Sequence, residues 1–225
     1  MDSFAVRLAA GEVCGVDMSG HDLRGLSFAG KSLSDCRFEG ALMSGCDFSG
    51  AKLTGCRFAR ALLDETVFDE ACITDCDLTG ADLRRSSWVR ASLVRAVLEQ
   101  ARLHRALLQE TAFSAVVWKG AAFPQATLYR LSGLPAWEDC DLTMTHCLQC
   151  DLSGMRIIRA TGRLLTLQEC QAREIMCTDS DMPQIIAMQT ELCASAFLRC
   201  GLQRAGFMGS DLSRCDFSGS DLSEA

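Results

Sequence analysis

Residues 36–63 read CRFEGALMSGCDFSGAKLTGCRFARALL, and within this stretch a large apolar residue returns at every fifth position. These positions are Phe38, Met43, Phe48, Leu53, Phe58 and Leu63. Two places before each of them stands a cysteine or an alanine. A period of five fits neither an α-helix, with about 3.6 residues per turn, nor a plain strand, whose side chains alternate. The stretch is therefore built from a repeated five-residue unit.

The same register continues in both directions without a polar residue at the large position. Beyond the stretch it comprises Met18, Leu23, Phe28, Leu33, Phe68, Ile73, Leu78, Leu83, Trp88, Leu93, Leu98, Leu103, Leu108, Phe113, Trp118, Phe123 and Leu128. Residues two apart lie on one face of an extended segment, so the large and small residues point inward together and the residue between them points out. The other two residues of each unit, often Ser-Gly or Thr-Gly, turn the chain. Stacked turns of this kind make a solenoid.

Several units carry a further resemblance: GCDFSG (45–50), GADLRR (80–85), QCDLSG (149–154), GSDLSR (209–214), RCDFSG (214–219) and GSDLSE (219–224). They resemble the A(D/N)LxG signature of the pentapeptide repeat family. The resemblance implies an all-β fold, a right-handed, four-sided parallel β-helix with about twenty residues per coil and about ten coils. Neighbouring coils would then stack about 4.8 Å apart.

The register breaks once. It fails after Leu128 and resumes at Leu142 one place out of phase, with YRLSGLPAWED (129–139) between the two blocks. We expect one loop insertion here, near residues 129–139, projecting from a corner of one continuous solenoid. The predicted organisation is an N-terminal cap segment (1–15), a first repeat block (16–130), an inserted loop (131–139) and a second repeat block (140–225).

Two interpretations of the break remain open. The insertion is either accommodated with Trp137 folded back on the coil, or it is a contact loop, since exposed loop aromatics are common binding anchors. In the second case the partner-binding residues are Tyr129, Arg130, Leu134, Pro135, Trp137, Glu138 and Asp139.

The second block is less regular than the first. Gly162 and Ala172 stand at large positions, while Leu165 and Ile175 stand at small ones. This exchange keeps the core volume roughly constant but changes the cross-section, so we expect distorted coils from about Met155 to Thr190.

Both ends of the solenoid need cover. At the start, we expect Phe4, Val6 and Leu8 to cover the first coil. The last units keep the full consensus without a following cap, and an uncapped solenoid exposes its last core layer and its unpaired strand edge. We therefore expect a C-terminal edge, with Phe217 and Leu222, that forms a homodimer or continues into further protein.

Charge is segregated along the chain. An acidic run that includes Asp64, Glu65, Asp69 and Glu70 precedes a basic run that includes Arg84, Arg85, Arg90 and Arg95. With about twenty residues per coil, these charges stack as opposite pairs on neighbouring coils. They form either a solvated ladder that also sets the register, or a docking face for a charged partner.

The cysteines and histidines give no sign of a catalytic or metal site, and packing explains where most cysteines stand. Nine of the fourteen cysteines fall at the small inward position, as expected for small buried hydrophobes: Cys36, Cys46, Cys56, Cys76, Cys140, Cys150, Cys170, Cys200 and Cys215. The three histidines have no ligand spacing, and no nucleophile stands beside a base. We predict no catalytic residue, no metal and no cofactor, and hence no enzyme.

Composition and charge argue against two further classes, nucleic-acid-binding proteins and membrane-spanning proteins. The 225 residues carry a formal net charge of -7, which argues against direct nucleic-acid binding, and no apolar run is long enough to cross a membrane. A cytoplasmic protein with a protein partner is expected. The resemblance implies a non-enzymatic protein-binding scaffold of bacterial type, as an accessory or effector module of a secretion system. The alternative within the same family is a DNA mimic that binds DNA gyrase.

Overall fold

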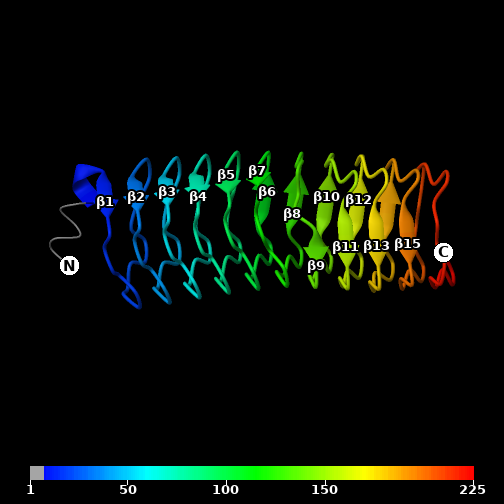
Figure 1. The fold of residues 1–225 in the computed structure, drawn as a ribbon, viewed down its shortest axis with the longest axis horizontal. Helices are drawn as coiled ribbons and strands as arrows, with labels where there is room; N and C mark the ends of the chain where they lie inside the picture. The colour runs from blue at the N-terminus through cyan, green and yellow to red at the C-terminus, as the bar shows by residue number, and fades with distance from the viewer. Residues whose placement is uncertain (1–7) are drawn as a thin grey trace.

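The computed structural model describes residues 8–225, which wind into one elongated parallel β-solenoid (Figure 1). Its strands are β1 (Glu12–Cys14), β2 (Ser32–Ser34), β3 (Lys52–Thr54), β4 (Cys72–Thr74), β5 (Ser92–Val94), β6 (Leu107–Gln109), β7 (Ala112–Ser114), β8 (Thr127–Tyr129), β9 (Trp137–Glu138), β10 (His146–Leu148), β11 (Arg156–Ile158), β12 (Thr166–Gln168), β13 (Met176–Thr178), β14 (Ile186–Met188) and β15 (Ala196–Leu198). The predicted all-β solenoid is confirmed.

The strands form three of the four sides. One sheet has the order β1-β2-β3-β4-β5-β7, a second β14-β12-β10-β8-β6 and a third β15-β13-β11-β9. The fourth side is held by isolated parallel bridges such as Leu42↔Leu62 and Asp82↔Arg102. Partners in the first block lie twenty residues apart, as in Leu33↔Leu53, so each coil consists of four five-residue sides.

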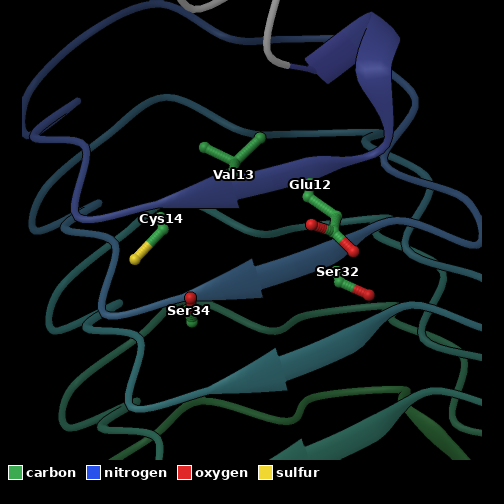
Figure 2. A pocket seen from close by; sticks show the side chains of 5 residues that line it. All are labelled: Glu12, Val13, Cys14, Ser32 and Ser34. Atoms are coloured by element: carbon green, nitrogen blue, oxygen red, sulfur yellow. The ribbon is translucent and has the colours of Figure 1, made fainter.

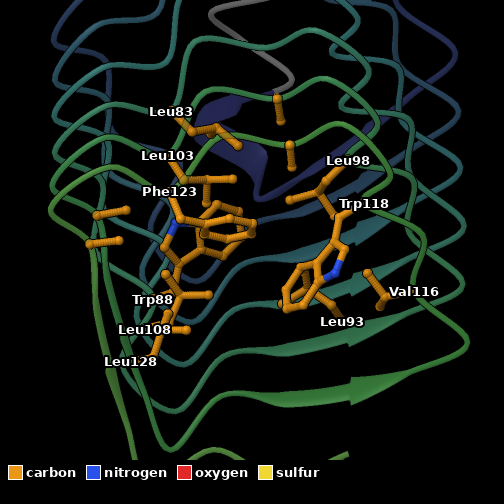
Figure 3. Close-up of a cluster of buried hydrophobic side chains, with 14 of the residues drawn as sticks. Leu83, Trp88, Leu93, Leu98, Leu103, Leu108, Val116, Trp118, Phe123 and Leu128 are labelled. Carbon is orange, nitrogen blue, oxygen red and sulfur yellow. The ribbon is translucent and has the colours of Figure 1, made fainter. Parts of the chain in front are cut away.

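The core is the set of inward columns that the sequence pattern predicts. The middle residue of each three-residue strand points inward, while its two neighbours are more exposed. Phe28, Phe48, Phe68 and Trp88 stack in one column, with ring centroids 4.5, 5.2 and 4.2 Å apart. Figure 3 shows Trp88, Trp118 and Phe123 among the leucines of the neighbouring columns. The interior is therefore filled by side chains.

Each side ends in a left-handed residue two places after the large one. Glycine fills this corner in many early coils, as at Gly50 (φ +62). Later coils place charged residues there, such as Asp75 (φ 54) and Arg95 (φ 52). A non-glycine residue pays about 1–2 kcal/mol for this conformation. Its backbone N–H is satisfied by the next coil, as in the 3.0 Å bond from Asp75 N to Val94 O.

The predicted loop insertion at residues 129–139 is wrong, because the chain there is one residue shorter than a regular coil. Thr127 pairs with His146, nineteen positions away, and the inward residues of the segment are Leu131 and Trp137. Leu142 thus stands fourteen positions after Leu128, one fewer than three five-residue units would give. Coil-to-coil hydrogen bonds continue through this segment, including Gly120 N to Glu138 O at 2.9 Å. The break is a shortened side within the wall.

The second block is more regular than its sequence predicts. Strands β10 to β15 pair at a constant spacing of twenty, for example Ile157↔Cys177, so the coils expected to be distorted between Met155 and Thr190 keep a regular register. Exchange of large and small residues explains this. Leu165 fills the space beside Gly162, where an added Cβ would lie 3.5 Å from the Leu165 Cβ.

The sequence predicts a covered first coil and an exposed last coil. Phe4 and Val6 lie outside the described residues, whereas Leu8 packs partly against the core. Strand β1 begins at Glu12, within the segment expected to form a cap. At the other end Phe217 is partly buried and Leu222 is 36% exposed.

Candidate functional site

The residues predicted to form one contact loop lie on separate sides of the solenoid. Tyr129 ends β8, Leu134 packs partly against the core, and Glu138 ends β9. Trp137 is 0% exposed and therefore cannot be a surface anchor. The interpretation in which Trp137 folds back on the coil is confirmed for this side chain. Its indole Nε1 has no hydrogen-bond partner, although such a buried N–H usually finds one.

The shortened side nevertheless presents a polar rim. The Arg130 guanidinium lies 4.8 Å from the centre of the Tyr129 ring, and its Nε donates a 3.0 Å hydrogen bond to Gln149. Leu134 and Gly133 line a hollow of about 130 Å³ next to the following coil. Tyr129 and Arg130 thus lie where the shortened side begins, and the half-buried Leu134 lies where it ends.

A charge network borders the shortened side on the third sheet. Lys119 Nζ lies 2.8 Å from Glu138, and Arg159 reaches both Glu138 at 2.8 Å and Asp139 at 2.7 Å. Hydrogen bonds from these two cations, Lys119 first, lower the pKa of Glu138. The Arg159 guanidinium likewise lowers the pKa of Asp139. Both carboxylates are therefore held ionised by neighbours on adjacent coils.

The two charged bands stack as the coil length predicts. Arg85 lies 2.9 Å from Glu65, and Arg90 lies 2.5 Å from Glu70. Arg95 and Arg84 are also paired, with Asp75 at 2.6 Å and Asp82 at 2.7 Å respectively. Arg85, Arg90 and Arg95 are solvent-exposed, where such pairs contribute little to stability. The pair of Arg84 with Asp82 differs, because it lies within one coil and Asp82 is buried. The bands neutralise each other across coils.

Asp64 and Asp69 behave differently from their neighbours in the acidic band. Asp69 accepts hydrogen bonds from Ser87 Oγ at 2.6 Å and Val89 N at 2.9 Å. Asp64 accepts one from Ser44 and lies 3.3 Å from Arg85. These carboxylates tie coils together through hydroxyl and backbone donors as well as through arginine.

The C-terminal edge exposes part of the last core layer. Phe217 stacks on Phe197, with ring centroids 5.3 Å apart, but its outer face has no further coil over it among the described residues. Leu222 continues the neighbouring column. This surface is flat and partly apolar.

The cysteines are placed for packing. All fourteen are free thiols, and eight of the nine at the small inward position are buried, while Cys215 near the end is half-buried. Burial raises the pKa of Cys46 to about 11 and that of Cys140 to about 12. Thiolates are the reactive form, so these side chains are poor nucleophiles and poor metal ligands. Within residues 8–225, no group of three His, Cys, Asp or Glu side chains is arranged to hold a metal ion.

Hollows on the outer wall are open and shallow. One of about 490 Å³ lies over β1 and β2 and is lined by Glu12, Val13, Cys14, Ser32 and Ser34. Figure 2 shows Val13 on the opposite side of β1 from Cys14, so the hollow is a stretch of outer sheet surface. Its polar groups are the Glu12 carboxylate, the Cys14 thiol and the hydroxyls of Ser32 and Ser34, with Glu12 in register beside Ser32.

Sequence comparison agrees with this architecture. The family described as "Pentapeptide repeats" matches in eight copies, over residues 32–69, 41–80, 76–114 and 197–225. The chain belongs to the pentapeptide repeat family. No curated protein matches this pentapeptide repeat chain. In the described part of the chain, no helix has the length and apolar character needed to cross a bilayer.

Solved pentapeptide repeat proteins share the fold at low sequence identity. Rfr23 from the cyanobacterium Cyanothece 51142 is 22% identical over 53% of this chain and 99% of its own, with a TM-score of 0.50. HetL, involved in heterocyst differentiation regulation in Nostoc sp. strain PCC 7120, is 20% identical over 99% of this chain and 94% of its own, with a TM-score of 0.41. QnrB1, a plasmid-mediated fluoroquinolone resistance protein, is 17% identical over 94% of this chain and 92% of its own, also with a TM-score of 0.41.

Sequence reasoning missed one surface of this pentapeptide repeat solenoid. The third sheet carries apolar residues at its outward positions, among them Ile158, Met176 and Leu198. Two strand sequences indicate this apolar surface. In MCT (176–178) and AFL (196–198), apolar residues stand directly beside the large position, where Asp, Arg or Ser is usual.

Proposed function

We propose that this chain is a non-enzymatic protein-binding scaffold. The observation that carries the proposal is the filled interior: the inward columns from Val13 to Leu202 are buried, so a ligand can contact only the outer sides and the ends. Those sides are rigid, nearly flat parallel sheets held by a continuous ladder of backbone bonds. Extended surfaces of this kind suit the recognition of another macromolecule.

The proposed contact surface on the wall is the shortened side. Its groups are the exposed Arg130 and the half-buried Tyr129, Leu134 and Pro135, and Glu138 and Asp139 form its charged border. Trp137 supports this surface from within the core. Interfaces of this type combine an aromatic or arginine anchor with a polar rim.

The C-terminal edge is the second proposed contact. Phe217 and Leu222 would be covered there by a protein partner or by a second copy. We also propose a finer role, in which this chain is an accessory or effector module of a bacterial secretion system and its partner is a protein of that system.

A capture experiment with the intact chain tests the scaffold. The chain is immobilised, captured proteins are identified by mass spectrometry, and binding is repeated with the double variant Tyr129→Ala/Leu134→Asp and with Phe217→Asp. A partner lost with the first variant places the contact on the shortened side, and one lost with the second places it on the edge. The matched control, Leu62→Asp, changes an exposed leucine on another side. Binding equal to wild type in every variant would refute both contact surfaces.

A further inference from the structure

The outward face of the sheet β9-β11-β13-β15 is unusually apolar. Met176 is 51% exposed, and Ile158, Ala196 and Leu198 are half-buried on the same outer surface. We call these four residues the apolar face. In the first coils the same side of the solenoid carries Arg37 and Arg57, and later coils carry Val97 and Val117. Thr178 stands in register between Ile158 and Leu198, so one polar residue divides the apolar face. Apolar groups gathered on one surface with a polar border mark an interaction surface, whereas single ones do not.

A ladder of alternating charges runs along one border of the apolar face. It consists of Asp139, Arg159, Asp179 and Arg199, one residue per coil, each at the left-handed corner that ends a strand. Arg159 lies 2.7 Å from Asp139, and Arg199 lies 2.6 Å from Asp179. Read along the solenoid, the signs are minus, plus, minus, plus.

This order of signs is complementary to itself when it is reversed. Consider a second copy facing the first, related by a two-fold axis that runs along the strands midway between β11 and β13. The axis reverses the order of the coils but keeps the corner at the same end of the strands. Asp139 then faces Arg199 of the second copy, and Arg159 faces Asp179. Isologous interfaces require this kind of self-complementarity.

Two further charges fit the same axis. Arg156 is exposed on β11 and Glu174 is exposed at the corner before β13. Among residues 8–225 neither side chain has an ion-pair or hydrogen-bond partner, although the Glu174 backbone N–H donates to Cys193 O at 3.1 Å. The axis that exchanges β11 and β13 places Arg156 of one copy beside Met176 and Glu174 of the other.

We propose that this chain self-associates through the apolar face, as an antiparallel two-fold dimer in which the sheets pack face to face. Ile158, Met176 and Leu198 are covered in the interface, at the usual separation of about 10 Å between packed sheets. The charge ladder sets the register of the two solenoids. This dimer covers Asp139, at the border of the shortened side, and leaves Tyr129, Arg130 and the C-terminal edge free for a partner.

Charge exchange tests the register directly. The variant Asp179→Arg/Arg199→Asp keeps an opposite-sign pair within the chain but changes the ladder to minus, plus, plus, minus, which sets like charges against each other between copies. The variant Asp139→Arg/Arg159→Asp does the same in the other half. Each variant alone should be monomeric in sedimentation velocity, and an equimolar mixture of the two should recover the dimer. Their thermal unfolding is recorded alongside, to establish that each remains folded.

A second arm tests the apolar contact. Met176→Asp should raise the dimer dissociation constant by at least about tenfold. The matched control Leu62→Asp, at a leucine 41% exposed on another side, should leave it unchanged. A wild-type chain that stays monomeric up to about 100 µM would overturn the proposal. So would a dimer that survives Met176→Asp but is lost with Phe217→Asp, because that result would place the contact at the C-terminal edge.

Discussion

Trp137 pairs with Ile157 across β9 and β11, and both side chains are buried in the same inward column. The pair shows how the solenoid absorbs the loss of one residue. Leu131 is the inward residue of the shortened side, Gly133 turns the chain in the left-handed conformation, and the wide indole of Trp137 follows four positions later. Because the backbone pairing resumes at once, the shortened side keeps its place in the wall.

Truncation of Trp137 should therefore destabilise the fold. Trp137→Ala leaves a cavity in the core, and we expect a loss of about 3–5 kcal/mol in the free energy of unfolding, measured in urea. Trp137→Phe should lose less, because the ring still fills much of the space and the unpartnered Nε1 is removed. Similar stability of wild type and Trp137→Ala would contradict the buried position.

The exchange of large and small residues at Gly162 and Leu165 can be tested by a double-mutant cycle. Leu165→Ala should lose about 2–5 kcal/mol by opening a cavity. Gly162→Leu should also destabilise, because an added Cβ would already lie 3.1 Å from Met182 Cγ and 3.5 Å from Leu165 Cβ. The double variant Gly162→Leu/Leu165→Ala restores the usual order of volumes and should lose less than the sum of the two. Strict additivity would mean that the two positions do not share one space.

Sequence periodicity predicted the columns and the stacked charge pairs, because each depends only on a constant step of five residues. Leu33 above Leu53 and Glu65 beside Arg85 follow from that step alone. The shortened side was mispredicted because a step of fourteen fits an insertion of four as well as a loss of one. Only the continued backbone pairing of Thr127 with His146 decides between them.

The apolar face was missed for a different reason. The repeat pattern predicts that apolar residues point inward. Met176 and Leu198 are apolar at outward positions, and the pattern alone did not predict that they form a surface. Their grouping becomes visible only when three coils lie side by side.

Thiol reactivity should follow burial. Cys14 and Cys72 are exposed, and Cys193 and Cys215 are half-buried, while the other ten thiols are buried. We expect an aromatic disulfide reagent to modify Cys14 and Cys72 promptly, Cys193 and Cys215 slowly, and the rest only after unfolding in urea. The double variant Cys14→Ser/Cys72→Ser should lose the prompt phase. Prompt reaction of Cys46 or Cys140, whose pKa values burial raises to about 11 and about 12, would contradict the packed core.

Acid should weaken the charge ladders. The neighbouring arginines lower the pKa of Asp75, Asp139 and Asp179 in the folded chain. A carboxylate with a lowered pKa stabilises the fold above its unfolded value of about 4, and this contribution is lost as the pH falls through the folded value. The unfolding midpoint should therefore be level above that pH and fall below it. The variant Asp75→Asn/Asp179→Asn should flatten the decline, and an undiminished decline would assign the effect to other groups.

The same ladders bear on the alternative role as a DNA mimic. Mimicry of a duplex needs a continuous acidic surface, because the phosphate backbone carries about one negative charge per 1.7 Å of helix axis. Here Arg85, Arg90 and Arg95 each pair with an acidic residue of the neighbouring coil, so the acidic band is interrupted. We therefore expect no inhibition of supercoiling by DNA gyrase at micromolar concentrations of the chain. The variant Arg85→Glu/Arg90→Glu/Arg95→Glu, which makes this band continuous, is the informative comparison. Inhibition by the wild-type chain would restore the mimic as its function, and inhibition by the variant alone would show that the arginines suppress it.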